Sequence, residues 1–294
     1  MKRQILVTLI IVCTSLTALS QTQLGYNLKV GDKFSIVQKA DQLITQDMYG
    51  QSHEMTNVIE GEYNMEVLRL TDNGYIIGFS FERFKMEANS NLIGLIMDVD
   101  TNLEAAEDDM QSQIFKGLIG VQMEMEMLKT GKIVEITGTD ELIDAMISGS
   151  GIEDGYVKDQ MTDAMAAEFG GGTLAASFEQ FTYIYPETKV RIGDTWENVF
   201  DGDLEADNTW TYASKENKQN TITGASTIAM NSSSDGMTMQ LTGTQDTKVV
   251  CDAKTGFMVS FSSESLGEGD SVMDAMGDTK IPTKIVTKTT YSLK

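Results

Sequence analysis

The chain has 294 residues, with 44 Asp and Glu against 22 Lys and Arg, and its formal net charge is −22 at pH 7. DNA and RNA are bound through a basic surface that displaces counterions from the phosphates, so this composition excludes nucleic acid as the partner. Anionic membrane surfaces are repelled for the same reason. Apolar residues make up 41% of the chain, which argues against disorder.

The first twenty residues are typical of a secretory signal peptide. Lys2 and Arg3 give a basic start, the apolar run from 5 to 19 follows, and small residues precede a cut before Gln21. The run is too short for a transmembrane helix, so no membrane span is expected after cleavage. We expect residues 21–294 to form one exported domain that is periplasmic, outer-membrane-associated or extracellular.

Cleavage would leave Cys251 as the one cysteine, so no intramolecular disulfide is expected. Cys251 follows two valines in an extended run and is expected to be a small buried hydrophobe. Lipid attachment at Cys13 is the lesser alternative, because Val12 before it is not small.

Long stretches with period-two alternation predict strands throughout the rest of the chain. Tyr75, Ile77 and Phe79 show the pattern, and Asp72-Asn73-Gly74 before them is a hairpin signal. The predicted strands are 34–48, 58–70, 75–87 and 121–127 in the first half, and 208–216, 221–230, 237–251, 257–264 and 284–293 in the second. A helix is expected around 102–118.

Two short motifs occur in the same order in both halves. Residues 30–34 (VGDKF) recur as 192–196 (IGDTW), and residues 129–134 (KTGKIV) recur as 254–259 (KTGFMV). Each glycine lies where a tight turn requires a positive φ. We interpret the pattern as an internal duplication.

Three helices are predicted between the halves. Thr139 precedes two acidic residues that suit a helix start, and a second helix covers 157–169. A third begins at Thr173 and carries apolar residues at helical spacing as far as Tyr185. Glycine-rich segments 148–151 and 170–172 separate the three.

These elements predict an α+β fold. Two related β-rich halves, 25–137 and 189–294, should form one curved antiparallel β-sheet of half-barrel shape. The helical block, 139–185, should pack on its concave face, because its apolar stripes are the ones available to cover that face.

No catalytic constellation is visible. The single histidine of the chain after cleavage, His53, excludes a histidine triad or a multi-histidine zinc site, and it is expected in an exposed turn. We expect no enzyme activity and no cofactor, with a hydrolase that uses two carboxylates as the open alternative. Acidic loops are expected at 201–207 and around Gly269-Asp270-Ser271.

Calcium has two candidate places, the carboxylate cluster at 201–207 and the stretch from 98 to 102. Asp98, Asp100 and Asn102 have the spacing that begins an oxygen-rich calcium loop. Leu103 stands where such a loop requires glycine, and a strand precedes it instead of a helix. Solvated turns and a helix cap at Asn102 are therefore the favoured interpretation.

Methionine is unusually frequent, with 19 in the chain. Several lie on faces that we expect to be buried, where they either fill irregular gaps in the core or line a soft apolar pocket. In the second interpretation the glycine-linked helices act as a lid. The candidate ligand-binding residues are Met123, Met125, Met127, Met146, Met161, Met165 and Phe178.

The Gly-Asp-x-aromatic starts, the Lys-Thr-Gly hairpins, Tyr185-Pro186 and the closing Ile281-Pro282 strand look like a group of exported Bacteroidota proteins with a domain of unknown function. More faintly, the pattern is similar to LolA-like lipoprotein-carrier half-barrels. That similarity implies an incomplete barrel with helices in its mouth and an apolar cavity between them.

We therefore expect a non-enzymatic envelope protein that binds an apolar or amphipathic molecule, a small molecule or a lipid, between sheet and helices. The alternative is a structural module with a solid core that contacts other envelope proteins. A cavity of roughly 300 Å³ or more would favour binding.

Overall fold

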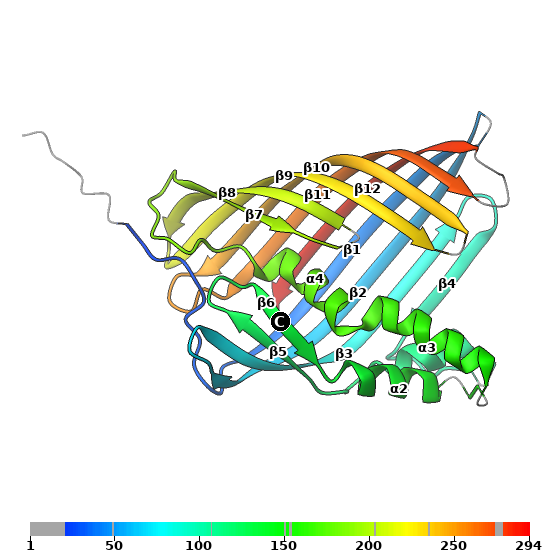
Figure 1. The fold of residues 1–294 in the computed structure, drawn as a ribbon, viewed down its shortest axis with the longest axis horizontal. Coiled ribbons are helices and arrows are strands. Elements are labelled where there is room, and N and C mark those ends of the chain that lie inside the picture. The colour runs from blue at the N-terminus through cyan, green and yellow to red at the C-terminus, as the bar shows by residue number, and fades with distance from the viewer. Residues whose placement is uncertain are drawn as a thin grey trace, which may run out of the picture.

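The computed structural model describes residues 21–294 except 49, 107, 150, 153, 154, 203, 235 and 274–278. The expected signal peptide, with Cys13, lies outside the described residues. Figure 1 shows one long curved sheet with the helices gathered on its concave side. In the described part of the chain, no helix combines the length and hydropathy needed to span a bilayer.

Twelve strands form the sheet. The first half contributes β1 (Lys33–Met48), β2 (Gln51–Leu70), β3 (Gly74–Ser90), β4 (Gly94–Asp100), β5 (Met123–Leu128) and β6 (Ile133–Thr137). The second half contributes β7 (Thr195–Phe200), β8 (Leu204–Glu216), β9 (Gln219–Ser234), β10 (Met237–Asp252), β11 (Met258–Met273) and β12 (Lys280–Leu293). The helices are α1 (Met110–Lys116), α2 (Thr139–Gly149), α3 (Tyr156–Phe169) and α4 (Gly171–Thr182).

Each half is an antiparallel meander, and the two are joined where the first strand pairs with the last. The order is β6-β5-β3-β2-β1-β12-β11-β10-β9-β8-β7, with β4 paired to the far end of β3. In the join, Gln38 of β1 lies opposite Tyr291 of β12. The predicted α+β class, with a curved antiparallel sheet, is confirmed.

The two Gly-Asp turns have the same structure. Asp32 accepts the backbone N–H of Lys29 at 2.8 Å, and Asp194 accepts that of Arg191 at 2.9 Å. The glycine of the first turn has φ of +85° and that of the second +92°. The repeated sequence therefore encodes a repeated turn, each leading into the first strand of its half.

Both Lys-Thr-Gly turns hold the segment before β1. The backbone N–H of Tyr26 donates to Lys129 in the first turn at 2.9 Å, and that of Asn27 donates to Thr255 in the second at 2.7 Å. Tyr26 is buried and its hydroxyl donates to the carbonyl of Thr182 at 3.1 Å. One short segment thus connects both halves with the end of α4.

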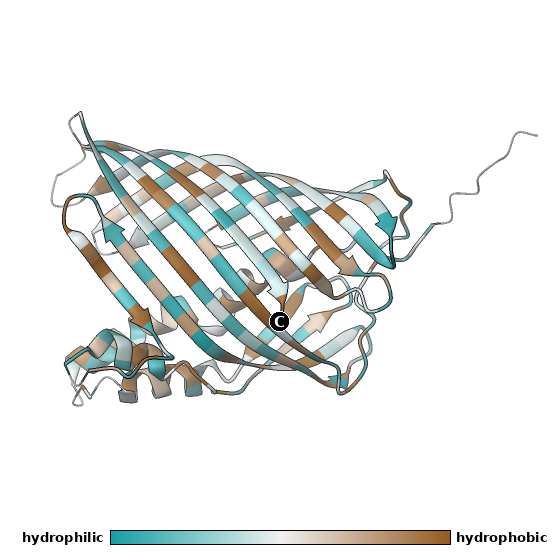
Figure 2. Cartoon of the chain, turned by 180° about the vertical axis from the view of Figure 1, so that it is seen from behind, coloured by the Kyte–Doolittle hydropathy of each residue, from teal (hydrophilic) through white to brown (hydrophobic). Residues whose placement is uncertain are grey.

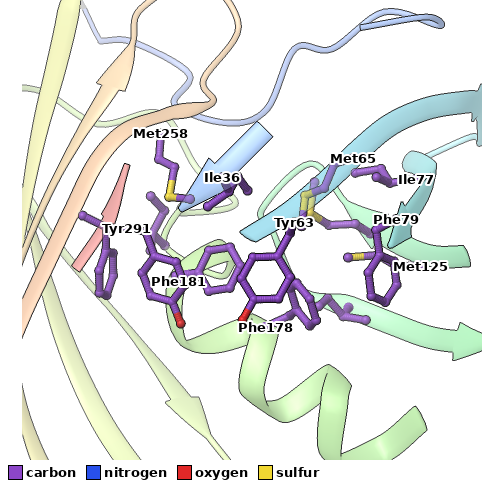
Figure 3. Close-up of a cluster of buried hydrophobic side chains, with 14 of the residues drawn as sticks. Ile36, Tyr63, Met65, Ile77, Phe79, Met125, Phe178, Phe181, Met258 and Tyr291 are labelled. Atoms are coloured by element: carbon purple, nitrogen blue, oxygen red, sulfur yellow. The ribbon is translucent and has the colours of Figure 1, made fainter. Parts of the chain in front are cut away.

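The core lies between the concave face and the helices (Figure 3). Phe178 of α4 contacts Phe79 of β3 with ring centroids 5.0 Å apart, and Phe181 contacts Tyr291 of β12 at 4.3 Å. Phe178 and Phe181 contact each other at 5.5 Å. An aromatic row on α4 therefore joins the two halves, with each edge contact contributing beyond its buried area.

Polar and apolar residues alternate along the strands, as the interleaved teal and brown in Figure 2 show, and Lys280, Lys284 and Lys288 of β12 are among the exposed outward residues. Ion pairs cross the strands there. Arg83 contacts Asp100 at 2.7 Å and Glu60 at 2.9 Å, which holds β4 against β3 and links both to β2. This pairing lowers the pKa of Asp100 below its ordinary value, with the Arg83 hydrogen bond as the largest cause.

Several expectations about local structure are wrong. The helix expected around 102–118 covers only Met110–Lys116, with Asp109 instead of Asn102 as its cap, and residues 204–207 of the expected acidic loop lie in β8. His53 lies within β2 instead of a turn, half-buried, with Nε2 2.9 Å from the Ser90 hydroxyl. Gly269-Asp270-Ser271 was expected in an acidic loop but lies inside β11. Ser271 is on the inward face of that strand and is fully buried. The third helix ends at Thr182, and buried Tyr185 follows in extended chain, donating its hydroxyl to the carbonyl of Gly256.

The Lys-Thr-Gly turn gives a stability prediction. Gly131 and Gly120 have φ of +93° and +80°, but only at Gly131 would a Cβ collide, with the carbonyl of Thr182. We expect Gly120→Ala to lower the free energy of unfolding by about 1–2 kcal/mol, from backbone strain alone. Gly131→Ala should cost at least about 2 kcal/mol more, because α4 must move. Urea unfolding of both variants measures the difference, and equal losses would contradict the tight contact.

Candidate binding cavity

Small side chains face inward where the long strands of the second half cross the concave face. Successive inward positions of β11 hold Ser263 and Ser265, which lie opposite Thr289 and Thr287 of β12. The corresponding stretch of β3 carries Tyr75, Ile77, Phe79 and Phe81. The second half therefore fills less of the interior than the first, and space remains there.

The space is a cavity of about 280 Å³. Its lining comes from β1, α4, β8, β9, β10, β11 and β12, and it consists of Gln42, Gln180, Leu204, Met230, Ser232, Met239, Gln245, Phe261, Ser263, Ser265, Thr287, Thr289 and Tyr291. None of these thirteen side chains is charged, although the chain contains 66 Asp, Glu, Lys and Arg residues. Three larger hollows on the described part of the chain, of about 710, 570 and 670 Å³, each have Lys, Asp or Glu residues in their lining.

Aromatic rings form one wall of the cavity. Phe261 and Tyr291 lie with centroids 5.4 Å apart at an angle of 80°, and Phe181 stacks on Tyr291 from α4. Burial raises the pKa of the Tyr291 phenol well above its ordinary value, so the hydroxyl stays neutral. The wall is therefore apolar with a neutral polar tip.

Uncharged amides and hydroxyls continue the lining beside these rings, on the same inward face of the sheet. Gln42 donates to the Thr287 hydroxyl at 3.4 Å and accepts from Asn57 at 2.9 Å. Gln245 of β10 is nearly buried and donates to Thr247 at 3.4 Å. Such groups orient a ligand through hydrogen bonds and provide neither a counter-ion nor a general base.

The helix that closes the cavity is fixed at both sheet edges. Glu179, next to the lining residue Gln180, accepts the backbone N–H of Ile133 in β6 at 2.8 Å. Just after the helix, the carbonyl of Tyr183 accepts from Asn198 of β7 at 2.7 Å. Desolvation raises the pKa of Glu179, partly offset by the Ile133 hydrogen bond.

The predicted ligand-binding residues lie elsewhere. Four of the methionines are fully buried in the core: Met123, Met125, Met127 and Met146. Phe178 is buried among Tyr63, Phe79 and Phe181, while Met161 and Met165 pack against the core from α3 and are partly exposed. None of the seven lines the cavity, whose two methionines are Met230 and Met239.

The calcium candidates have other contacts. Both carboxylate oxygens of Asp100 bond to Arg83, and one also accepts the backbone N–H of Asn102 at 3.0 Å. Asp98 lies on β4 opposite Glu87. Within the described ranges no group of three or more His, Cys, Asp or Glu side chains is able to hold a metal ion.

A sequence signal for the cavity exists in β11. From Phe261 to Ser271, alternate positions read Phe, Ser, Ser, Gly, Gly, Ser, and they all lie on the inward face. A strand with small residues on its buried face leaves volume unless a neighbour fills it. That pattern marks a place for a ligand only when the register of the neighbouring strands is known.

Comparison with solved structures shows similarity of fold. A structure of lipovitellin, concerned with its lipid–protein interactions, matches with a TM-score of 0.53 and 10% identity over 91% of this chain and 25% of that chain. This chain thus spans about a quarter of the length of that chain. An outer membrane channel from Pseudomonas putida F1 matches with a TM-score of 0.30 and 8% identity, over 92% and 97% of the two chains.

A search among curated proteins finds no match. A family model does match, over residues 72–258, which is more than half of the chain and runs from the start of β3 to the start of β11. The matched region includes the helical block and six of the thirteen residues that line the cavity, from Gln180 to Gln245. The chain therefore belongs to the DUF6263 family, a family of unknown function.

Proposed function

We propose that the protein binds an uncharged amphipathic molecule in the cavity between α4 and the second half of the sheet, without catalysing a reaction. The observation that carries the proposal is the lining, which is free of charge in a strongly acidic chain. A partly buried lining without charge disfavours an ion, because the ion would lose part of its hydration without gaining a partner.

The same lining supports a binding role over an enzymatic one. It contains no His, Cys, Asp, Glu or Lys to act as a general base or nucleophile, and its tyrosine is held neutral by burial. The volume of about 280 Å³ lies just below the roughly 300 Å³ that we expected of a binding cavity, so it limits the ligand to a small one. It suits a short acyl or isoprenoid portion with a hydroxyl, amide or ester group.

The fold similarity to lipovitellin supports an apolar portion in the ligand. That structure concerns lipid–protein interactions, and part of it matches 91% of this chain in fold. We further propose that the protein acts after export, on the basis of the signal-like residues 1–20. A structural module that contacts envelope proteins is the second candidate, favoured by the solid packing of the first half.

Uptake of a neutral probe tests the proposal. We expect N-phenyl-1-naphthylamine fluorescence to rise on binding and to be reversed by monolaurin. Laurate, which has the same acyl chain with a carboxylate, should compete about tenfold less well at pH 8, because its charge is desolvated. Absence of uptake, or equal competition by laurate, would contradict a neutral site.

A pair of variants on one strand locates the binding. Ser265→Phe places a ring in the cavity, whereas Ser260→Phe places it on the exposed, outward face of the same strand. We expect the first variant to weaken probe binding at least about tenfold and the second to leave it unchanged. Circular dichroism and the urea midpoint check that both variants fold. Loss of binding in both would show that the site is elsewhere.

The predicted lid provides a further test. Met161 and Met165 lie on α3 and do not line the cavity. Replacing both by Leu conserves volume, so the fold should persist with less than about 1.5 kcal/mol lost. Probe affinity, measured by titration, should stay within about twofold of wild type. A larger change in affinity would indicate that the ligand contacts α3, as the lid hypothesis predicts.

A further inference from the structure

The most exposed apolar segment outside the cavity is the connection between β3 and β4 together with the start of β4. We call residues 91–97 the β3–β4 tip. Its large side chains are those of Leu92, Ile93, Leu95 and Ile96, which are 60%, 74%, 60% and 44% exposed. Figure 1 places this connection at the far end of the long strands, opposite the Lys-Thr-Gly turns, and Figure 2 shows brown residues there.

Hydrogen bonds at its base hold the tip away from the body of the protein. The Asn91 side chain donates to the carbonyl of Ser52 at 3.0 Å and accepts the backbone N–H of Glu54 at 3.0 Å. The Ser90 hydroxyl accepts the backbone N–H of Leu92 at 3.1 Å. The four apolar side chains are thus displayed by a braced turn, so their exposure does not result from a loose loop.

Charge is absent from the tip and its approach. Residues 88–97 (ANSNLIGLIM) carry no ionisable side chain, although about one residue in five of the chain is charged. Asp98 is the first charged residue after this stretch and Glu87 the last before it. The tip therefore suits a partner surface that becomes apolar a few ångströms below its outer boundary. Binding to such a surface requires no oppositely charged groups on the partner.

The area of the tip decides between a protein and a membrane as partner. Four partly exposed side chains present on the order of a few hundred Å², whereas a standard protein interface buries about 800 Å² on each partner. A lipid surface has no such threshold, because each apolar side chain gains separately on entering the acyl boundary.

We propose that the β3–β4 tip inserts into the surface of a zwitterionic lipid bilayer and docks the protein there reversibly. Anionic lipid is disfavoured by the net charge of −22 and by the acidic residues that flank the tip. The proposal does not rest on the cavity. The tip and the cavity are made by different strands and give separate readouts.

Vesicle co-sedimentation tests the docking. We expect the exported protein to sediment with phosphatidylcholine vesicles, and less with vesicles that also contain phosphatidylserine. The double variant Ile93→Asp, Leu95→Asp should lower the partition coefficient at least about tenfold. The matched control Leu266→Asp, Val286→Asp changes two apolar residues of similar type, 38% and 41% exposed on the outward face, and should retain binding.

A second readout reports insertion directly. In I93W, the new indole should be quenched by phosphatidylcholine brominated on its acyl chains, whereas the native Trp196 and Trp210, which are partly or fully buried, should not respond in the wild type. This variant keeps the tip apolar and so avoids the risk of misfolding.

Three results would overturn the proposal: no sedimentation with phosphatidylcholine, equal sedimentation of wild type and the tip double variant, or sedimentation that requires phosphatidylserine. A dimer of the wild type that the tip variant dissociates in analytical ultracentrifugation would also overturn it, because the tip would then be an interface between copies. Probe uptake by the cavity should be unchanged in the tip variants, so failure of either proposal is recognised separately.

Discussion

The contact on which the rest of the structure depends is the seating of α4 across the open side of the sheet. A curved sheet with edges at β6 and β7 leaves its concave face open unless something spans the two edges. The helix does so with two aromatic side chains and one carboxylate. Phe178 and Phe181 join the aromatic cores of the halves, and Glu179 between them satisfies a backbone donor of the edge strand β6. Gln180 then faces the cavity.

The two halves use the concave face differently, although their turns are equivalent. In the first half large side chains meet α2 and α4 and fill the interior, as Met125 and Met146 do with no measurable exposure. In the second half serines and threonines face inward, and their small volume leaves the cavity. Equivalent turns thus begin the sheet of each half in the same way. The size of the inward side chains then decides whether the interior of that half is packed or contains a cavity.

Local patterns accounted for most of the fold. Period-two alternation located the long strands, and the apolar stripe of α2 was correctly expected to be buried. A strand before the Asp98 stretch was expected without bounds, because Leu95 and Ile96 of β4 are both exposed and break any alternation. The cavity was missed for a different reason. Ser265 and Thr287 lie opposite each other only through the register of β11 and β12, and pairings of this kind are not written in either strand alone.

The hydrogen bonds between the segment before β1 and the two Lys-Thr-Gly turns determine when the fold is completed. Asn27 is held by a turn 228 residues later, and β1 cannot gain its second neighbour until β12 exists. Contacts this distant in sequence carry a large loop-closure cost and slow folding. A nascent chain that has made only its first half therefore lacks both the partner strand and the second turn. The first half of the sheet therefore stays without its central neighbour until the last strand of the chain has been made.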